Sequence, residues 1–360
     1  MTKLSGGVLG VFSSMGELGG VERSALEAWR AIAEASAGPN HVLSFGPPIP
    51  SGVASLVRAA GGSLLESQSH LTAALHAASR RWPVRLVLFW HIGLVKLLPC
   101  LRTTGARNVL FIHGVEAWRK PSPAVARLLR QVDLFLTNSN FTWETFLRHH
   151  PDLRAAAHCT VPLGLDVPLE PNSAGEPDDP PSALMIGRIA GSESYKGHDA
   201  VIAAWPLVTK QIPGARLRMI GPSDVTPELR ALAVHHGVAD VIEISGSVSD
   251  AEKQRALAAC RCMALPSLAE GFGLVYVESM RMGRPCIIST HDAGREVVCP
   301  DAGLAVDPAN PSELAAALVR LMTPGAAWDN WSAAATRRYN EHYTAQHFRE
   351  RLIAALAGSL

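Results

Sequence analysis

The sequence predicts an α/β protein built from two Rossmann-like, doubly wound parallel sheets, one in each half of the chain. Three observations support this fold class. Short, continuous apolar runs alternate with helix-length segments, which is typical of parallel strands covered on both faces. A stretch rich in proline and acidic residues at 168–182 divides this alternation into two series. The length of 360 residues suits two domains that each have their own core.

The first series begins with an apolar run at 7–12, which we expect to form a strand. A glycine-containing loop at 13–20 follows it, and 21–36 then carries apolar residues at helical spacing. Further apolar runs and helix-length segments continue the alternation. We expect strands at 41–45, 86–90, 109–113 and 134–137, and helices at 71–80 and 123–131.

The second series follows a predicted linker at 166–182. Because ligands of doubly wound sheets bind beyond the carboxyl ends of the strands, the loops after the strands are the candidate sites. We expect strands at 183–186, 216–220, 241–245, 262–265 and 286–289, and helices at 200–211, 227–236, 250–259, 274–282 and 311–322.

The net charge of +1 conceals two halves of opposite sign. Residues 1–165 contain 16 Lys and Arg against 9 Asp and Glu, whereas residues 166–360 contain 17 against 23. The excess lies in a basic block at 67–132, which contains ten basic residues and a single acid, Glu116. Such a block often forms a solvated face, but it also suits an anionic partner. Nucleic acid is not favoured, because no reader motif accompanies the block. Its ten basic residues are Arg80, Arg81, Arg85, Lys96, Arg102, Arg107, Arg119, Lys120, Arg127 and Arg130.

The N-terminal segment, the apolar runs and the cysteines together predict a cytoplasmic protein. The apolar start at 1–14 lacks a basic leader and a small-residue cleavage site, so we expect a strand there rather than a secretory signal. The nearest approach to a membrane span, at 84–101, is interrupted by charged residues and a proline. The six cysteines lack disulfide or metal-ligand spacing, so we expect reduced thiols.

Two loops of the second half carry candidate chemistry. Arg188 follows the run at 183–186, and Lys196 precedes the next predicted helix. Two fixed cations so placed can grip a diphosphate from two sides. Glu270 lies in a polar, glycine-containing loop after the strand at 262–265, and Glu278 lies in the following helix. Carboxylates there can accept hydrogen bonds from the hydroxyls of a sugar or a ribose.

The first half offers two weaker signals. Gly19 and Gly20 precede a predicted helix, where glycines allow close backbone approach and a helix N-terminus offers free N–H groups to an anion. The loop fits neither G-x-G-x-x-G nor the P-loop, so an ordinary turn remains open. His113 ends a predicted strand before a glycine, which suits ligand contact, although a lone histidine is more often a satisfied core residue.

Together these motifs resemble glycosyltransferase family 4, the retaining enzymes of the GT-B fold that use nucleotide-sugar donors. The specific part of the resemblance is the spacing of Arg188 and Lys196 combined with the family's Glu-x7-Glu pattern at Glu270 and Glu278. The resemblance extends over about 19–298. The segment 190–194, between the two cations, departs from the family pattern as an insertion.

The resemblance implies a role for each part of the chain. Residues 1–165, with a returning helix at about 337–360, would form the acceptor-binding domain, and 183–336 the donor-binding domain across a central cleft. Arg188 and Lys196 would bind the donor diphosphate, and Glu270 the sugar hydroxyls. The donor-binding set is Gly19, Gly20, Arg188, Lys196, Val248, Gly271, Phe272, Gly273, Leu274 and Glu278, and the catalytic set is His113 and Glu270.

The resemblance further implies retaining transfer of a hexose without a metal or another cofactor. The sequence contains no Asp-x-Asp, so Arg188, Lys196 and helix N-termini would stabilise the departing nucleoside diphosphate. No carboxylate is identified for a covalent intermediate, which favours front-face substitution with His113 as a stabilising or orienting group. UDP-sugar and GDP-sugar donors both remain open.

The basic first half is expected to bind the acceptor, a saccharide or a lipid-diphosphate-linked saccharide. Residues 80–130, together with the apolar Leu94, Leu97, Leu98 and Leu101, suit an anionic membrane surface, so we expect a peripheral association with the inner face of the membrane. Two other classes stay open: a catalytically silent GT-B scaffold subunit, and a sugar-nucleotide epimerase or phosphorylase of this fold. The intact site residues disfavour the first, and nothing marks the lysine that a phosphorylase needs for pyridoxal phosphate.

Overall fold

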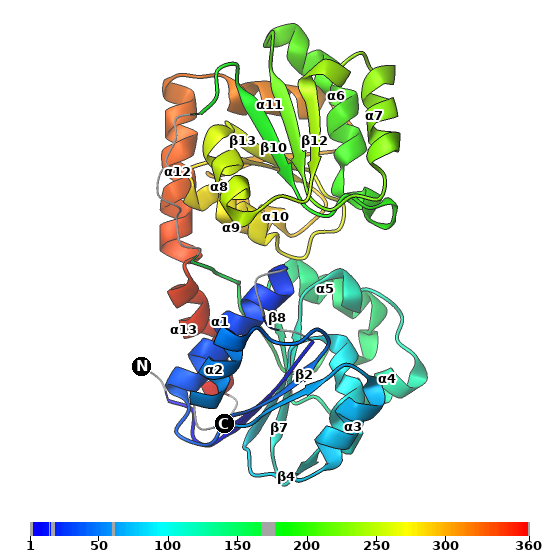
Figure 1. Cartoon of the computed structure of the whole chain (residues 1–360), viewed down its shortest axis with the longest axis vertical. Helices are drawn as coiled ribbons and strands as arrows, with labels where there is room; N and C mark the ends of the chain where they lie inside the picture. The colour runs from blue at the N-terminus through cyan, green and yellow to red at the C-terminus, as the bar shows by residue number, and fades with distance from the viewer. Residues whose placement is uncertain (1–2, 14, 16–18, 60–61, 167–176, 359–360) are drawn as a thin grey trace. The chain divides into compact units, whose positions relative to one another are not determined.

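The computed structural model divides the chain into two compact units. Unit 1 comprises Met1–Leu165 and Thr344–Leu360, and unit 2 comprises Asp166–Tyr343. Each unit contains a parallel sheet with helices on both faces, as Figure 1 shows. The predicted fold class, α/β with two Rossmann-like sheets, is therefore confirmed. The structure describes all residues except 1–2, 14, 16–18, 60–61, 167–176 and 359–360, so most of the predicted linker at 166–182 lies outside the described residues.

Unit 1 is built on a seven-stranded sheet in the order β3-β2-β1-β5-β7-β8-β9, with every neighbouring pair parallel. The chain moves outward from β1 to β3 and then returns to the other side of β1, so β1 and β5 border a topological switch point. The strands are β1 (Val8–Phe12), β2 (His41–Phe45), β3 (Leu64–Ser67), β5 (Leu86–Phe89), β7 (Arg107–Ile112), β8 (Leu134–Thr137) and β9 (His158–Thr160), and β4 (Arg81–Trp82) pairs separately with β6 (Arg102–Thr103).

The helices of unit 1 begin where short polar side chains can cap them. Ser69, Ser122 and Ser139 each accept a hydrogen bond from a backbone N–H three residues on, which satisfies one of the open donors at a helix start. The helices are α1 (Gly20–Ala35), α2 (Ser51–Ala59), α3 (His70–Ala78), α4 (Pro123–Leu129), α5 (Asn140–His149) and α13 (Ala345–Ala357), with a 3₁₀ helix η1 (Ile92–Cys100).

The chain returns to unit 1 later than the sequence analysis expects. The returning helix is α13, which packs on α1, and Phe348, Leu352 and Leu356 are fully buried there. Residues 337–343 lie in unit 2, and within that unit Tyr339 donates a 2.7 Å hydrogen bond to Asp166. The expected start at about 337 is therefore corrected to Ala345.

Unit 2 is built on a six-stranded parallel sheet in the order β12-β11-β10-β13-β14-β15. Its strands are β10 (Ser182–Ile186), β11 (Arg216–Ile220), β12 (Ile242–Gly246), β13 (Cys262–Leu265), β14 (Cys286–Ser289) and β15 (Gly303–Val306). Its helices are α6 (His198–Gln211), α7 (Thr226–His235), α8 (Asp250–Ala259), α9 (Leu274–Arg281), α10 (Gly294–Val298), α11 (Pro311–Met322) and α12 (Ala326–His342), with a 3₁₀ helix η4 (Gly191–Lys196).

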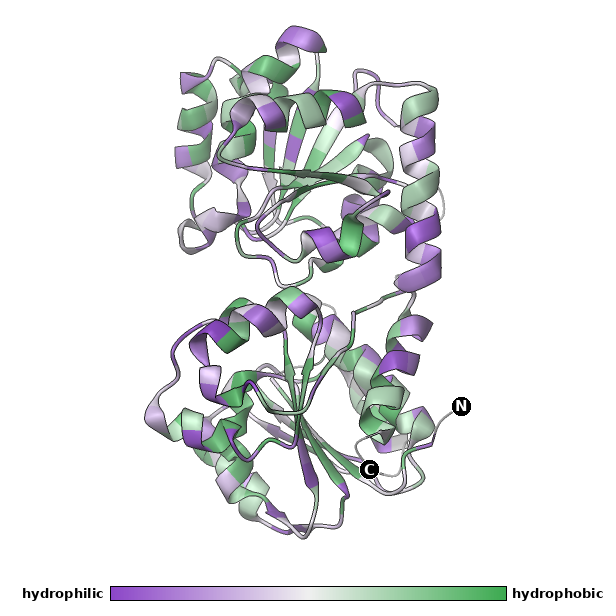
Figure 2. Ribbon diagram, turned by 180° about the vertical axis from the view of Figure 1, so that it is seen from behind, coloured by the Kyte–Doolittle hydropathy of each residue, from purple (hydrophilic) through white to green (hydrophobic). Residues whose placement is uncertain are grey.

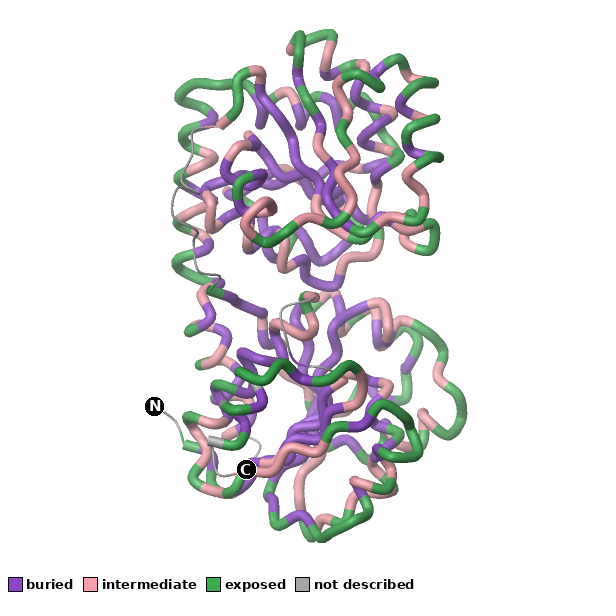
Figure 3. Tube along the Cα trace, in the orientation of Figure 1, coloured by how far each residue is buried: buried purple, intermediate pink, exposed green. Residues whose placement is uncertain are grey.

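The core of each unit lies along its sheet. The central strands are apolar and buried, while the outer faces of the helices are largely polar and exposed (Figures 2 and 3). In unit 1, Trp90 stacks obliquely on Phe111 with ring centroids 4.4 Å apart, and in unit 2 Trp205 of α6 is fully buried. Continuous burial of the strands explains why their apolar runs do not alternate with polar residues.

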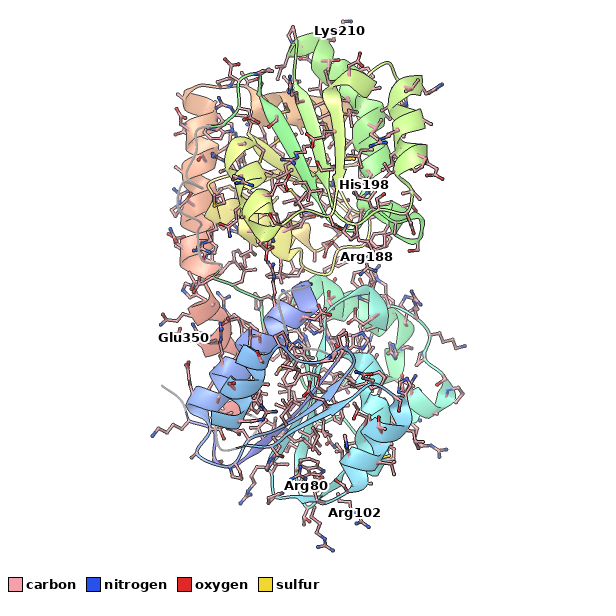
Figure 4. The ribbon with its side chains drawn as sticks, viewed as in Figure 1. Arg80, Arg102, Arg188, His198, Lys210 and Glu350 are labelled. Carbon is pink, nitrogen blue, oxygen red and sulfur yellow. The ribbon has the colours of Figure 1, made fainter. Side chains whose placement is uncertain are left out.

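The apolar residues expected at a membrane surface belong instead to the core of unit 1. Leu94 and Leu97 lie in η1 and are buried, and Leu98 and Leu101 are partly buried against the same cluster. The expectation that these leucines meet a membrane is therefore wrong, because all four pack in or against the core cluster of unit 1. Arginines of the basic segment do reach the surface, and Figure 4 shows Arg80 and Arg102 at one end of unit 1. Of the helices that the structure describes, none combines the length and apolar character that a bilayer span requires.

Candidate functional site

Unit 2 gathers its candidate residues at its own topological switch point. β11 and β12 lie on one side of β10, and β13 to β15 lie on the other, so the carboxyl ends of β10 and β13 border the reversal. Arg188 follows β10 by two residues, and the loop that holds Glu270 follows β13. Ligands of doubly wound sheets bind at this kind of crevice.

Arg188 and Lys196 converge on one carboxylate, that of Glu193. Nη1 of Arg188 lies 3.1 Å from Oε1 of Glu193, and Nζ of Lys196 lies 2.6 Å from Oε2. The side chains of Lys196 and Glu193 are only 15% and 17% exposed, whereas that of Arg188 is 66% exposed. Figure 4 shows Arg188 and His198 at the same end of unit 2, with Lys210 at the far end of α6. The sequence-predicted cation pair is thus assembled around an acid.

The loops after β10 and β13 contact each other next to Lys196. The N–H of Leu268 donates to the carbonyl of Tyr195 across 2.7 Å. Gly197, which follows Lys196, has φ +79°, and a Cβ there would lie 2.7 Å from the carbonyl oxygen of Pro266. A side chain at this position would strain the backbone and separate the loops. Glycine therefore sets the position of Lys196 relative to the Glu270 loop.

Glu270 lies half-buried in the second of these loops. The backbone N–H groups of Phe272 and Gly273, two of the groups expected to hold phosphate, donate instead to its carboxylate. Burial raises the pKa of Glu270, and the nearby Lys196 opposes that rise by attracting the negative charge. Lys196 is therefore close enough to act on both Glu193 and Glu270.

Asp292 contacts the backbone of Glu270, and it was not identified from the sequence. It is 3% exposed, and the backbone N–H groups of Gly294 and Glu270 donate to its carboxyl, the first across 2.9 Å to Oδ1. Oδ2 has no hydrogen-bond partner among the described residues. Burial, together with the charge of Glu270, raises the pKa of Asp292 to about 8, so this carboxyl is mostly protonated at neutral pH. The carbonyl of Glu270 in turn accepts from the N–H of Ala293 across 3.1 Å.

His198 is a further buried group beside the cations. It is the first residue of α6 and 4% exposed, and its Nε2 has no hydrogen-bond partner among the described residues. Burial, and then the charge of Lys196, lower the pKa of His198 to about 4. The ring is therefore neutral at physiological pH and adds no third cation to the site.

Glu278 and Val248 occupy the neighbouring helix α9 and the loop before α8. Oε1 of Glu278 accepts a 3.0 Å hydrogen bond from Nζ of Lys253, a lysine of α8 that the sequence analysis does not single out. Val248 packs against a small apolar cluster that includes Leu184 and Ile220. Val248 thus packs close to β10 and β11, and Glu278 is held from α8.

A pocket of about 270 Å³ lies elsewhere in unit 2. It is lined by the amino ends of β10, β11 and β12 and by the end of α8, including Ser182, Arg216 and Ile242. These strand ends are opposite to those that carry Arg188 and Glu270. The chemistry of the candidate site therefore rests on its loops and not on this pocket.

In unit 1, His113 follows β7 and is enclosed by aromatic rings. It is 7% exposed, stacks on Phe111 with centroids 4.8 Å apart, and its Nε2 lies 2.8 Å from the carbonyl oxygen of Trp90. Because a carbonyl only accepts, Nε2 carries the hydrogen and Nδ1 is the acceptor of the ring. Burial lowers the pKa of His113 to about 4, although Glu116 opposes this shift, so the ring is neutral at pH 7.

The glycines of the first loop of unit 1 begin α1. Gly19 is its N-cap, with extended backbone and no capping side chain, and Gly20 is its first residue. The start of α1 lies against the residue that follows β5, because Nε1 of Trp90 donates to the carbonyl of Val21 across 3.2 Å. Residues 16–18 of this loop lie outside the described residues.

Comparison with known proteins gives this arrangement a context. The family model "Glycosyl transferases group 1" matches residues 180–324, the part that holds the site of unit 2. A GDP-mannose-dependent alpha-(1-6)-phosphatidylinositol monomannoside mannosyltransferase of Mycobacterium tuberculosis is 28% identical over 273 residues, 68% of this chain and 70% of its own length. The MMP alpha-(1->4)-mannosyltransferase of Mycolicibacterium hassiacum is 30% identical over 223 residues, 59% of this chain and 52% of its own.

The chain is a glycosyltransferase of the GT-B fold. Solved structures share that fold over nearly the whole chain: Anabaena Alr3699/HepE in complex with UDP and glucose has a TM-score of 0.76 at 16% identity, and covers 98% of this chain and 99% of its own. The apo form of the lipopolysaccharide outer core galactosyltransferase WaaB has a TM-score of 0.71 at 14% identity, with coverages of 98% and 100%. The resemblance to family 4 is consistent with these relatives.

Three residues of the glycosyltransferase site were not identified from the sequence. Glu193 lies in the segment that resembles an insertion, Asp292 follows β14, and Lys253 lies in the middle of α8. The position of Asp292 after a buried strand is a signal that could have found it. Glu193 and Lys253 carry no such signal, because only the folded chain brings them to their partners.

Proposed function

We propose that the glycosyltransferase transfers a hexose, with retention, from a nucleoside-diphosphate sugar to a saccharide or lipid-linked saccharide acceptor. The observation that carries this proposal is the meeting of Arg188, Lys196 and Glu270 at the switch point of unit 2. Two relatives named above are mannosyltransferases, one of them GDP-mannose-dependent, while a structural neighbour binds UDP and glucose. GDP-mannose and UDP-glucose are therefore the first donors to test.

In this proposal each loop of unit 2 binds a different part of the donor. Lys196 and Arg188 bind the diphosphate, as a point charge and a forked donor respectively. Glu270 accepts hydrogen bonds from the hydroxyls of the sugar, and Glu278 from those of the ribose. Val248 lies beside the base. The N–H groups of Phe272 and Gly273 hold the Glu270 carboxylate, and the backbone of Gly271 and Leu274 at the start of α9 contacts the phosphates.

The reaction that follows is front-face substitution without a metal ion. The bond between the anomeric carbon and the leaving phosphate oxygen breaks, the acceptor oxygen bonds the same carbon on the same face, and the leaving phosphate takes the acceptor proton. Lys196 and Arg188 stabilise the charge that develops on the nucleoside diphosphate. His113 orients the reacting sugar through its neutral ring, and Gly19 and Gly20 offer backbone N–H groups. Full activity in EDTA is the expected result, and a loss that Mg²⁺ restores would contradict this proposal.

Unit 1 is proposed to bind the acceptor and to meet an anionic membrane. Supporting this are the exposed Arg80, Arg81 and Arg102, together with the exposed leucines Leu71 and Leu75 of α3 in the same unit. Each basic residue near an anionic leaflet contributes about 1 kcal/mol. We expect co-sedimentation with phosphatidylglycerol vesicles that weakens as salt rises, and little binding to phosphatidylcholine vesicles. Binding that depends on neither salt concentration nor lipid charge would contradict the proposed association with an anionic membrane.

The deciding experiment is a donor-binding comparison of matched lysine variants. Lys196 ends η4, two residues before α6 begins, and the exposed Lys210 lies near the other end of α6. Thermal shift and calorimetry with GDP-mannose, UDP-glucose, GDP and UDP should show binding by the wild type and by Lys210→Ala. Lys196→Ala should bind at least tenfold more weakly and should lose sugar transfer or donor hydrolysis. Equal binding by all three proteins would refute the assignment of this site.

A further inference from the structure

The cation pair of unit 2 already holds an acid of the chain itself. We propose that Glu193 is an internal competitor of the donor diphosphate, which must displace the Glu193 carboxylate from Lys196 and Arg188. This inference rests on the proposed function, because it assumes that these cations bind the diphosphate. It adds a specificity-determining residue that the Glu-x7-Glu pattern does not contain.

The geometry supports a single carboxylate shared by both cations. Each oxygen of Glu193 serves a different partner, with Nζ of Lys196 at 2.6 Å and Nη1 of Arg188 at 3.1 Å. The contact with Lys196 is the stronger of the two, because both of its side chains are about five-sixths buried while Arg188 is largely exposed. A phosphate that contacts both cations would need the same hydrogen-bonding directions.

The backbone around Glu193 is fixed, so competition involves its side chain. The N–H of Gly191 donates to Oδ1 of Asp224 across 2.9 Å, and the N–H of Ile189 donates to the carbonyl of Pro222 across 2.9 Å. Glu193 itself has φ −120° and ψ 29°, a non-helical conformation inside η4. This kink lets its carboxylate reach back to Arg188 and forward to Lys196.

Charge explains what such a competitor achieves. With Glu193 in place, the three side chains carry a net charge of +1, and without it they would carry +2. A diphosphate has more negative charge and more oxygens than a single phosphate, so it can displace the carboxylate where a monophosphate cannot. Glu193 thereby favours the binding of diphosphates over that of phosphate. It also lowers the affinity for the nucleoside diphosphate that remains after transfer.

The test measures anion affinity in a charge-neutral variant. Glu193→Gln keeps the shape and removes the charge, and the exposed Glu228 of α7 gives a matched control in Glu228→Gln. Calorimetry with GDP, UDP, inorganic pyrophosphate and inorganic phosphate is run on both variants, the wild type and Lys196→Ala. We expect Glu193→Gln to bind pyrophosphate and the nucleotides about tenfold more tightly, because a neutral amide no longer competes with the anion for Lys196 and Arg188. Its preference for pyrophosphate over phosphate should fall, and Glu228→Gln should match the wild type.

The outcomes separate this inference from the proposed function. Equal or weaker anion binding by Glu193→Gln, while Lys196→Ala still loses nucleotide binding, would overturn the inference and leave the function standing. Unchanged binding by Lys196→Ala would instead refute the donor site itself. If Glu193→Gln fails to fold, Glu193→Asp shortens the reach to Lys196, and tighter binding of pyrophosphate is again the expected result. Unchanged or weaker pyrophosphate binding by Glu193→Asp would overturn the inference.

Discussion

Lys253 of α8 donates a hydrogen bond to Glu278 of α9 across 3.0 Å, and the two side chains are only 14% and 11% exposed. The pair joins the helix that carries the second glutamate of the Glu-x7-Glu pattern to its neighbour. A carboxylate so enclosed depends on its cation more than a surface carboxylate does.

Removing Lys253 should therefore lower the free energy of unfolding more than removing one partner of an equally close surface pair. We expect Lys253→Ala to lower the free energy of unfolding by about 3 kcal/mol, because a largely buried charge loses a cation. Arg130 lies 3.0 Å from Asp152, but these side chains are 55% and 50% exposed. Arg130→Ala should cost no more than about 1 kcal/mol. Urea unfolding of both variants measures the difference, and equal losses would contradict this account of the pair.

Gly197 should tolerate substitution less well than a glycine with the same backbone conformation in open space. Gly197 and Gly237 have φ +79° and +67°, but only Gly197 would place a Cβ against another loop, at 2.7 Å from the oxygen of Pro266. Gly237→Ala should cost about 1 kcal/mol from backbone strain alone. Gly197→Ala should lower the melting temperature further and weaken nucleotide binding, since Lys196 moves with it. Identical melting temperatures and affinities would show that the contact with Pro266 is unimportant.

Asp292 should make the protein less stable as the pH rises. Its pKa is about 8 in the folded state against 3.8 as the reference, so between these values the folded state binds a proton that the unfolded state has released. The contribution of the Asp292 carboxyl to the free energy of unfolding is therefore fully present below pH 3.8 and is lost as the pH rises toward 8. Asp292→Asn removes this loss, so its stability relative to the wild type should increase from pH 5 to pH 8. Urea unfolding at both pH values tests this, with Asp240→Asn, an exposed site, as the control.

His113 should act in the opposite direction, on the acid side. Its pKa is lowered to about 4, so from pH 6.5 downward the unfolded state gains a proton that the folded state excludes. The stability it contributes is present above pH 6.5 and is lost as the pH falls toward 4. Since His158 and His198 have similarly lowered pKa values, His113→Gln should make the acid decline shallower without abolishing it. The His113 imidazole should also show no NMR titration between pH 5.5 and 8.

The strands could be predicted from the sequence because burial on both faces leaves an unbroken apolar run. The run at 134–137 is β8 residue for residue, and 262–265 is β13. The segment α2 to β3, by contrast, mixes glycine, serine and short apolar stretches, and tertiary packing decides its structure. The leucines of η1 were misplaced for a related reason: an apolar patch beside basic residues looks the same whether it faces solvent or the core.

The candidate site divides in the same way. Arg188, Lys196 and Glu270 could be identified because each follows a strand or precedes a helix, and parallel strands bring those positions together. Glu193 and Lys253 could not, because their importance comes from what they touch: a cation pair for Glu193, and the carboxylate of Glu278 for Lys253. Spacing along the chain does not encode those contacts.

The late return of the chain to unit 1 bears on the order in which the protein is made. Unit 2 is one continuous segment, Asp166–Tyr343, while unit 1 needs Thr344–Leu360 to bury Phe348, Leu352 and Leu356. A ribosome that reads from the N-terminus therefore releases all of unit 2 before the last helix of unit 1 has left the exit tunnel. Although domains generally fold in the order of synthesis, here the second can finish first, and the face of α1 that α13 covers stays open to chaperones until α13 emerges.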